Sequence, residues 1–317
     1  VILGAVALWG ESRAAPAYAY NYKVKFEGES SYGWVRVIDD HSRYLRLMLS
    51  DSSAISALRM DPGHKGETIL PYLFTLEWLP YIRPGSKDAL LIGLGGGYIV
   101  GALEKRGVIT DSIELDPLVA QAAREWFRLE PPGKLIVGDA RYEIKNLDKK
   151  YDFIIHDCFT GGSVPAHLLS VEMLRELKAL LKPDGILAIN FVGSTDLARD
   201  HASAAVSRTL REVFAHQRVF SLQPESVFDD FIFLSSAAPL EVESADLPEG
   251  MVMNVDLERL LASELHFAPE RGFIITDDYN PLESMQVRKA EAYRGRLDDA
   301  IARNGGDAVE QLRVEEE

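Results

Sequence analysis

A run of glycines directly after a short apolar segment is the feature that most constrains the fold of this chain. Ala89 to Ile92 is apolar and predicts a buried strand, and residues 98–106 after the glycines predict a helix. A strand that turns tightly through glycines into a helix is typical of α/β sheets that bind a nucleotide near the helix N-terminus. The alternative is a tight turn without a ligand. We expect a cofactor site, and its candidate residues are Gly93, Gly95, Gly96 and Gly97.

The next apolar segment ends in an acid. Val108 to Glu114 predicts a second strand, and Glu114 follows the glycines at the spacing of about 20 residues that is typical of a ribose-binding carboxylate. A carboxylate accepts hydrogen bonds from both ribose hydroxyls. Asp116 precedes Pro117, which favours the first turn of a helix, so we expect Asp116 to be an N-cap.

A third candidate follows the strand predicted at residues 134–137. Asp139, which precedes Ala140, is placed to accept a hydrogen bond from the exocyclic amine of adenine. An aspartate at the start of a predicted helix is also a typical N-cap, and the two roles are compatible. We therefore include Asp139 and Ala140 in the expected cofactor site.

The fourth predicted strand, residues 152–156, leads to the candidate catalytic residue. Asp157 follows this strand at the point where a substrate would meet the cofactor, and the alternative is a structural turn aspartate. We expect His156 to point into the sheet. Cys158 has no basic residue nearby in the sequence, so we expect a small buried side chain rather than a nucleophile.

Alternating strands and helices predict a doubly wound α/β sheet, with ligands beyond the carboxyl ends of its strands. A further strand is expected at residues 186–192, and a hairpin of Val219–Leu222 and Phe228–Ser235 closes the sheet. The expected helices are 98–106, 117–128, 140–147, 171–182 and 196–214.

A small antiparallel β-domain is expected before this sheet. Short runs of alternating polar and apolar residues predict half-exposed strands at Tyr22–Phe26, Gly33–Ile38 and Arg43–Leu49. Glu67–Tyr81 then carries apolar residues at helical spacing and predicts a helix that leads into the larger domain.

The charge balance restricts the class of ligand. The chain has 49 acidic and 34 basic residues, a formal charge of -15, which argues against nucleic acid as a partner. A small cationic substrate would suit this field, although acidic surfaces also serve solubility alone. The single cysteine excludes an internal disulfide and a cysteine-rich zinc site, and we expect no metal.

The chain begins with an apolar stretch, Val1 to Trp9. About 20 residues are needed to cross a bilayer, so this stretch is too short to span one alone. Three interpretations stay open: the end of a membrane segment, the core of a trimmed signal peptide ahead of Ala17–Ala19, and a packed or disordered terminal extension.

Taken together, these motifs resemble the spermidine synthase family of aminopropyltransferases, over the span from Ser31 to about Pro281. The matching segments are Gly93–Gly97, Glu114–Asp116, Gly138–Ala140 and Asp157. The resemblance implies a small N-terminal β-domain followed by a Rossmann-like domain of the S-adenosylmethionine-methyltransferase type. It implies transfer of an aminopropyl group from decarboxylated S-adenosylmethionine to a polyamine, and it implies a homodimer.

Two later segments resemble the branch of this family in which the domain is fused behind membrane helices. They are Thr276–Pro281 and Pro165–Leu169. This resemblance implies that Val1–Trp9 is the end of the last helix and that the protein lies on the cytoplasmic side, tethered before residue 10. The expected division is a leader over 1–20, a β-domain over 21–66, a catalytic domain over 67–290 and a charged tail over 291–317.

The chain departs from the family on the polyamine side. Thr160 stands where the family has the second acid of its catalytic loop, and the Tyr-His-Glu segment is not evident between Gly63 and Tyr72. Asp277 and Asp278 are the candidates to replace the acceptor-binding acids, unless they form only a solvated turn. Two alternatives follow: a methyltransferase that uses intact S-adenosylmethionine, and a non-catalytic domain that binds a nucleoside or a polyamine.

Overall fold

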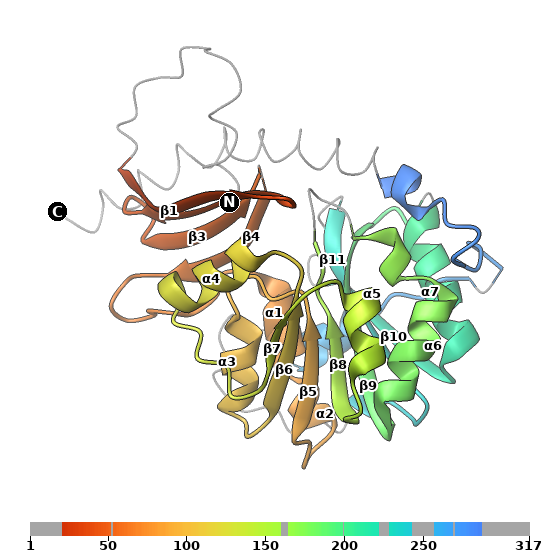
Figure 1. The fold of residues 1–317 in the computed structure, drawn as a ribbon. Coiled ribbons are helices and arrows are strands. Elements are labelled where there is room, and N and C mark those ends of the chain that lie inside the picture. Colours follow the sequence, from red (N-terminus) through yellow and green to blue (C-terminus); the bar gives the residue numbers. More distant parts are fainter. Residues whose placement is uncertain are drawn as a thin grey trace.

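The computed structural model contains two β-sheets, with helices around the larger one (Figure 1). It describes residues 21–51, 53–159, 164–198, 200–221, 228–242, 257–268 and 270–286. The expected leader, the expected charged tail and Thr160 therefore lie outside the described residues. Within the described ranges, none of the helices has both the length and the apolar character needed to cross a bilayer.

The smaller sheet is antiparallel, and its strands are neighbours in chain order. They are β1 (Tyr22–Ser30), β2 (Gly33–Asp40), β3 (Leu45–Ser50) and β4 (Ser53–Arg59). The first three confirm the predicted strands. The fourth is missed by the sequence pattern because its Ser- and Ala-rich sequence has few of the β-branched and aromatic residues that favour strands.

The central strands of the smaller sheet are buried on both faces. Val35 and Val37 of β2 belong to the apolar core that also covers one face of the larger sheet. Ile38 and Leu47 belong to a separate apolar cluster. The expectation of half-exposed strands is therefore wrong for β2 and β3. Polar residues are buried there as well as apolar ones, as Arg36 and Asp39 of β2 are each 5% exposed.

The larger sheet has a parallel centre and an antiparallel hairpin at one end. Its strands are β5 (Asp88–Ile92), β6 (Ile109–Glu114), β7 (Leu135–Val137), β8 (Tyr151–His156), β9 (Leu181–Ser194), β10 (His216–Ser221) and β11 (Phe228–Ser236). They lie in the order β10-β11-β9-β8-β5-β6-β7. β11 runs antiparallel to both β9 and β10, which confirms the predicted closing hairpin.

Helices cover both faces of this sheet. They are α1 (Pro71–Leu76), α2 (Leu79–Ile82), α3 (Tyr98–Glu104), α4 (Pro117–Trp126), α5 (Ala140–Glu143), α6 (Val171–Leu180), α7 (His201–Val213) and α8 (Leu257–Ala262). Successive side chains of a buried strand point to opposite faces. Leu91 of β5 accordingly packs in the cluster with α1 to α4, whereas Leu90 and Ile92 pack in the cluster with α5 to α7.

The single helix predicted over Glu67–Tyr81 is wrong. The chain forms two short helices there, and Pro71 and Pro80 stand in their first turns. Proline has no backbone N–H and cannot continue a helix, but it fits the first turn, where that donor is not needed. The two prolines therefore start new helices, and α1 packs against β11 of the larger sheet.

α4 joins the two sheets (Figure 1). Asp116, which caps the start of α4, accepts a 2.7 Å hydrogen bond from Ser30 Oγ of β1. At the other end of α4, the Trp126 carbonyl accepts a 2.7 Å hydrogen bond from Arg46 of β3. The smaller sheet is therefore fastened at both ends of this helix.

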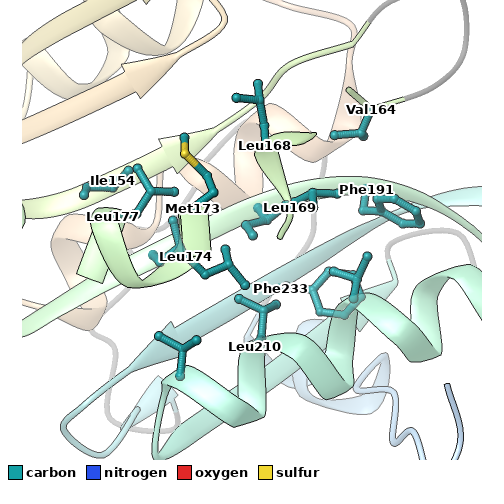
Figure 2. Close-up of a cluster of buried hydrophobic side chains, with 14 of the residues drawn as sticks. Ile154, Val164, Leu168, Leu169, Met173, Leu174, Leu177, Phe191, Leu210 and Phe233 are labelled. Atoms are coloured by element: carbon teal, nitrogen blue, oxygen red, sulfur yellow. The ribbon is translucent and has the colours of Figure 1, made fainter. Parts of the chain in front are cut away.

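A second apolar core lies between β9, β11, α6 and α7 (Figure 2). Leu174 of α6 and Leu210 of α7 reach into it, and the rings of Phe191 and Phe233 meet edge to face at 6.4 Å. This core holds α6 and α7 against the sheet.

We predict that Leu174→Ala lowers the free energy of unfolding by about 2–5 kcal/mol, because Leu174 is 1% exposed and its loss leaves a cavity. Urea denaturation followed by circular dichroism measures the change. Arg175→Ala, on the exposed side of the same helix, is the matched control and should change the free energy by less than about 0.5 kcal/mol. Equal losses in the two variants would contradict this packing.

Candidate active site

The glycine turn after β5 is pressed against neighbouring parts of the protein. Gly93 has φ of +88°, and a Cβ atom there would lie 2.3 Å from the Asp157 carbonyl oxygen. A Cβ atom on Gly95 would lie 2.9 Å from the carbonyl oxygen of Ile55 in β4. Glycine is therefore required at these positions for chain packing, and this requirement holds whether or not a ligand is bound.

The other two glycines of the turn are also tightly surrounded. A Cβ atom on Gly96 would lie 2.5 Å from the Ser56 hydroxyl of β4. Gly97 has φ of +76° and stands at the N-cap of α3. The turn therefore lies between the missed strand β4 on one side and the loop after β8 on the other.

Glu114 ties this turn to the end of β6. Its two carboxylate oxygens accept hydrogen bonds from the backbone N–H groups of Leu94, at 2.8 Å, and Asp116, at 2.9 Å. Glu114 is only 9% exposed, and burial raises the pKa of its carboxyl group, although the backbone hydrogen bonds act in the opposite direction. The carboxylate is held in one orientation beside the glycine turn.

Two aspartates at strand ends cap helices. Asp116 accepts a 2.8 Å hydrogen bond from the N–H of Leu118 in α4, which confirms the predicted N-cap. Asp139 accepts a 2.8 Å hydrogen bond from the N–H of Arg141 in α5, so its capping role is also confirmed. Asp139 is exposed, whereas Ala140 next to it is buried.

Asp157 lies directly after β8 and is bound through both carboxylate oxygens. Oδ2 accepts a 3.0 Å hydrogen bond from Tyr72 Oη of α1, and Oδ1 accepts a 3.0 Å hydrogen bond from Asn190 Nδ2 of β9. Burial raises the pKa of the Asp157 carboxyl group, and the two hydrogen bonds act in the opposite direction. The residue is therefore oriented and is more basic than an ordinary aspartate.

The two residues next to Asp157 in the sequence are not placed to act as a base or a nucleophile. His156 is fully buried, as expected, and burial lowers its pKa to about 4. The Cys158 thiol donates to the Ile92 carbonyl oxygen at 3.3 Å. Burial raises the pKa of Cys158 well above its ordinary value, and the charges of nearby Glu114, Asp157 and Asp139 add to this effect. A thiol that stays protonated is a poor nucleophile, in agreement with the sequence interpretation.

These interactions show which predicted residues come together. Backbone contacts join the glycine turn, Glu114 and Asp157. The charge of Asp139 also reaches this region, since it raises the pKa of the Cys158 thiol. Tyr72 and Asn190 were not predicted. Tyr72 lies in the segment where the sequence lacks the Tyr-His-Glu motif, and Asn190 lies inside a predicted strand rather than at its end.

The segment around Asp277 lies beside α5. Asp277 forms an ion pair with Arg141, and its N–H donates to Glu172 at 3.0 Å. Asp278 is exposed. The segment borders a cavity of about 640 Å³. The residues that line this cavity are Arg141, Val164, Pro165, Ala166, His167, Asp277, Asn280 and Glu283.

The negative charge of Asp277 is thus matched by Arg141. Its proposed role in binding an ammonium group would require it to leave or share this partner. No cluster of three or more histidine, cysteine, aspartate or glutamate side chains that is suited to a metal ion occurs in the described part of the chain.

We predict that Gly93→Ala destabilises the protein by about 1–3 kcal/mol, because alanine is strained at this φ and its Cβ atom would strike the Asp157 carbonyl oxygen. Urea denaturation measures the loss. Gly101→Ala in α3 is the matched control, since a Cβ atom there meets nothing within 4 Å. It should be neutral or stabilising by up to about 1 kcal/mol, and equal destabilisation of both variants would refute the described contact.

We predict that Tyr72→Phe raises the pKa of Asp157 further, because the Tyr72 hydroxyl donates to its carboxylate form. The measurement is a pH titration of the ¹³C-labelled aspartate carboxyl groups by NMR. Tyr142→Phe, at a position that is 67% exposed, is the control and should leave this pKa unchanged. A pKa that does not move in Tyr72→Phe would mean that this hydrogen bond is not formed in solution.

The residues of the candidate site lie in a segment that matches a known domain. Residues 80–226, which include the glycine turn, Glu114, Asp139 and Asp157, match the model of the spermine/spermidine synthase domain. A probable spermidine synthase from Corynebacterium glutamicum has the same fold, with a TM-score of 0.57 and 20% identity over 67% of this chain and 80% of its own.

Two relatives are more similar in sequence. The N-terminal histidine N-methyltransferase of Emericella nidulans is 32% identical over 61% of this chain and 37% of its own length. The polyamine aminopropyltransferase of Vibrio vulnificus is 38% identical over 47% of this chain and 54% of its own length. The chain thus spans less than two thirds of each relative. Residues 80–226, just under half of the chain, therefore match the spermine/spermidine synthase domain.

Proposed function

We propose that this protein is a transferase that moves an aminopropyl group from decarboxylated S-adenosylmethionine to a polyamine. The observation that carries the proposal is Asp157, an oriented carboxylate of raised pKa beside the glycine turn. Such a group is a stronger base than an ordinary aspartate. The family domain and the aminopropyltransferase relative of Vibrio vulnificus support this reaction.

The residues around the turn suit the nucleoside part of the donor. Each carboxylate oxygen of Glu114 accepts one backbone hydrogen bond and keeps a lone pair for a ribose hydroxyl. Asp139 is exposed at the next strand end, where it can accept from the adenine amine. The backbone at Gly93, Gly95, Gly96 and Gly97 and the buried Ala140 are the other proposed nucleoside contacts.

Asp157 would act as the general base that takes a proton from the acceptor. An alkylammonium group has a pKa of about 10 in water, so the acceptor must lose a proton before its nitrogen can attack. Asp157 takes this proton while Tyr72 and Asn190 hold the carboxylate. The nitrogen bonds to the carbon beside the sulfonium, the carbon–sulfur bond breaks, and its electron pair stays on the sulfur of methylthioadenosine.

The acceptor in this proposal is a small polycation. The formal charge of -15 favours its approach. Thr160 and Asp278 are the proposed acceptor contacts, together with Asp277 if it shares its charge between the acceptor and Arg141. Dimerisation, which the family resemblance implies, stays a prediction.

Methyl transfer from intact S-adenosylmethionine is the second candidate. It is favoured by the Emericella nidulans methyltransferase, which is 32% identical over 61% of this chain. Thr160 also favours it, because a threonine would not repel the carboxylate that distinguishes the intact donor from the decarboxylated one. Both candidates use the same nucleoside contacts and differ in the transferred group.

The test pairs each donor with putrescine or spermidine and identifies the nucleoside product by mass spectrometry. We expect methylthioadenosine and an extended polyamine, formed only from the decarboxylated donor. S-adenosylhomocysteine formed from the intact donor would instead support the methyltransferase. Nucleoside binding without any product would overturn aminopropyl and methyl transfer to these polyamines and would favour the binding-domain alternative.

We predict that Asp157→Asn lowers kcat by about 10²- to 10⁴-fold with nucleoside affinity retained, because the general base is removed. Glu114→Ala should weaken nucleoside binding by roughly 10- to 100-fold, the loss expected for hydrogen bonds to a charged group. Asp148→Asn, on the exposed loop before β8, is the control and should leave both unchanged. Full activity in Asp157→Asn would remove this residue from the mechanism.

A further inference from the structure

Three neighbouring strands of the larger sheet, β8, β9 and β11, change from apolar to polar residues at the end of the sheet where Asp157 lies. We call this end the polar edge. On the face covered by α1, the apolar residues of these strands are Phe153, Ile155, Ile186, Ala188, Ile232 and Leu234. Alternate residues of a strand share a face. Continuing this alternation to the edge leads to three polar residues, Asp157 after β8, Asn190 in β9 and Asp230 in β11.

The strand register brings these three residues together. The parallel pairing of β8 with β9 sets Asp157 beside Asn190. The antiparallel pairing of β9 with β11 sets Asp230 opposite Val192, two positions beyond Asn190 on the same face. Diagonal neighbours of this kind are about 7–8 Å apart, which is within reach of polar side chains. Asp230 therefore extends the polar edge that begins at Asp157.

Asn190 contributes a buried acceptor. Its Nδ2 donates to Asp157 Oδ1 at 3.0 Å, and the residue is 2% exposed. Its Oδ1 atom is buried and accepts no hydrogen bond from any residue that the structure describes. A buried acceptor without a donor costs about 1–3 kcal/mol, so it is usually matched by a water or a ligand.

Charge makes the same edge favourable for a cation. Burial, together with the negative charges of Asp229 and Asp157, raises the pKa of Asp230 to about 7, although a hydrogen bond from Asn190 acts in the opposite direction. Two carboxylates that share a site resist ionising together. A bound cation would relieve this repulsion and favour the ionised form of both.

We propose that Asp230 is a substrate-binding residue that holds the ammonium group of an amine substrate together with Asp157 and Asn190 Oδ1. An ammonium group has three N–H donors and no acceptor, which matches a cluster that presents carboxylate and carbonyl oxygens. The choice of a polyamine as the amine rests on the proposed function. In this arrangement β11 supplies the second acid that the loop lacks at Thr160.

The chain offers a matched control next to Asp230. Asp229 is adjacent on β11 and therefore points to the opposite face, where its carboxylate accepts a 2.6 Å hydrogen bond from Ser221 Oγ. The groups that face the cluster from other elements are Tyr72 of α1 and Asp157 of β8. Asp229→Asn thus removes the same charge from the same strand without removing a group from the cluster.

The kinetic test measures KM and kcat for putrescine and spermidine. Asp230→Asn should raise KM by about 10- to 100-fold, the loss of one charge-assisted contact, and leave kcat within a few-fold. Asp230→Glu, which keeps the charge, should recover most of the affinity, and Asp229→Asn should leave KM near the wild-type value. Circular dichroism shows that each variant is folded.

Calorimetry tests the same subsite without turnover. In the presence of methylthioadenosine at pH 7, polyamine binding to the wild type should release protons, which are detected by comparing buffers of different ionisation enthalpy. Asp230→Asn should lose this release and bind the polyamine more weakly, whereas Asp230→Glu should retain it. These results would support the subsite even if the wild type transferred no aminopropyl group.

Three outcomes would overturn the proposal. One is unchanged polyamine affinity and proton release in Asp230→Asn. Another is an equal loss in Asp229→Asn, which would indicate a general effect of charge. The last is the absence of polyamine binding to the wild type.

Discussion

The close contact between Gly93 and the backbone of Asp157 is the constraint on which the site depends. There is no room for a side chain at Gly93, and the Asp157 N–H donates to the Ile92 carbonyl at 2.8 Å. Glu114, the last residue of β6, is attached to the glycine turn because its carboxylate accepts a hydrogen bond from the Leu94 N–H. The glycine turn and the candidate catalytic carboxylate are therefore held at a fixed distance by backbone contacts, which are less adjustable than contacts between flexible side chains.

The parts of the site that could be predicted depend on short stretches of sequence. Glu114 ends β6, and Asp139 and Asp157 come shortly after β7 and β8. The carboxyl ends of parallel strands meet at one edge of the sheet. The N-caps at Asp116 and Asp139 depend on only a few neighbouring residues. The order of strands and helices between residues 89 and 235 was predictable because it depends on the same kind of local pattern, whereas α8 was not predicted.

The remaining residues depend on contacts between distant segments. Tyr72 reaches Asp157 because two prolines divide the expected helix and α1 packs on the sheet. Asp230 lies near the start of an antiparallel strand, so a search of strand ends passes over it. Asp277 pairs with Arg141, a residue 136 positions away, which no local pattern indicates.

The packing of β4 on the glycine turn makes the smaller sheet part of the candidate site. The Ile55 carbonyl and the Ser56 hydroxyl occupy the space that side chains at Gly95 and Gly96 would need. The two sheets are thus not modules that can be separated or exchanged freely. A graft of another β-sheet in front of this domain would have to reproduce the backbone path of β4, or the glycine turn would lose the surface against which it is shaped.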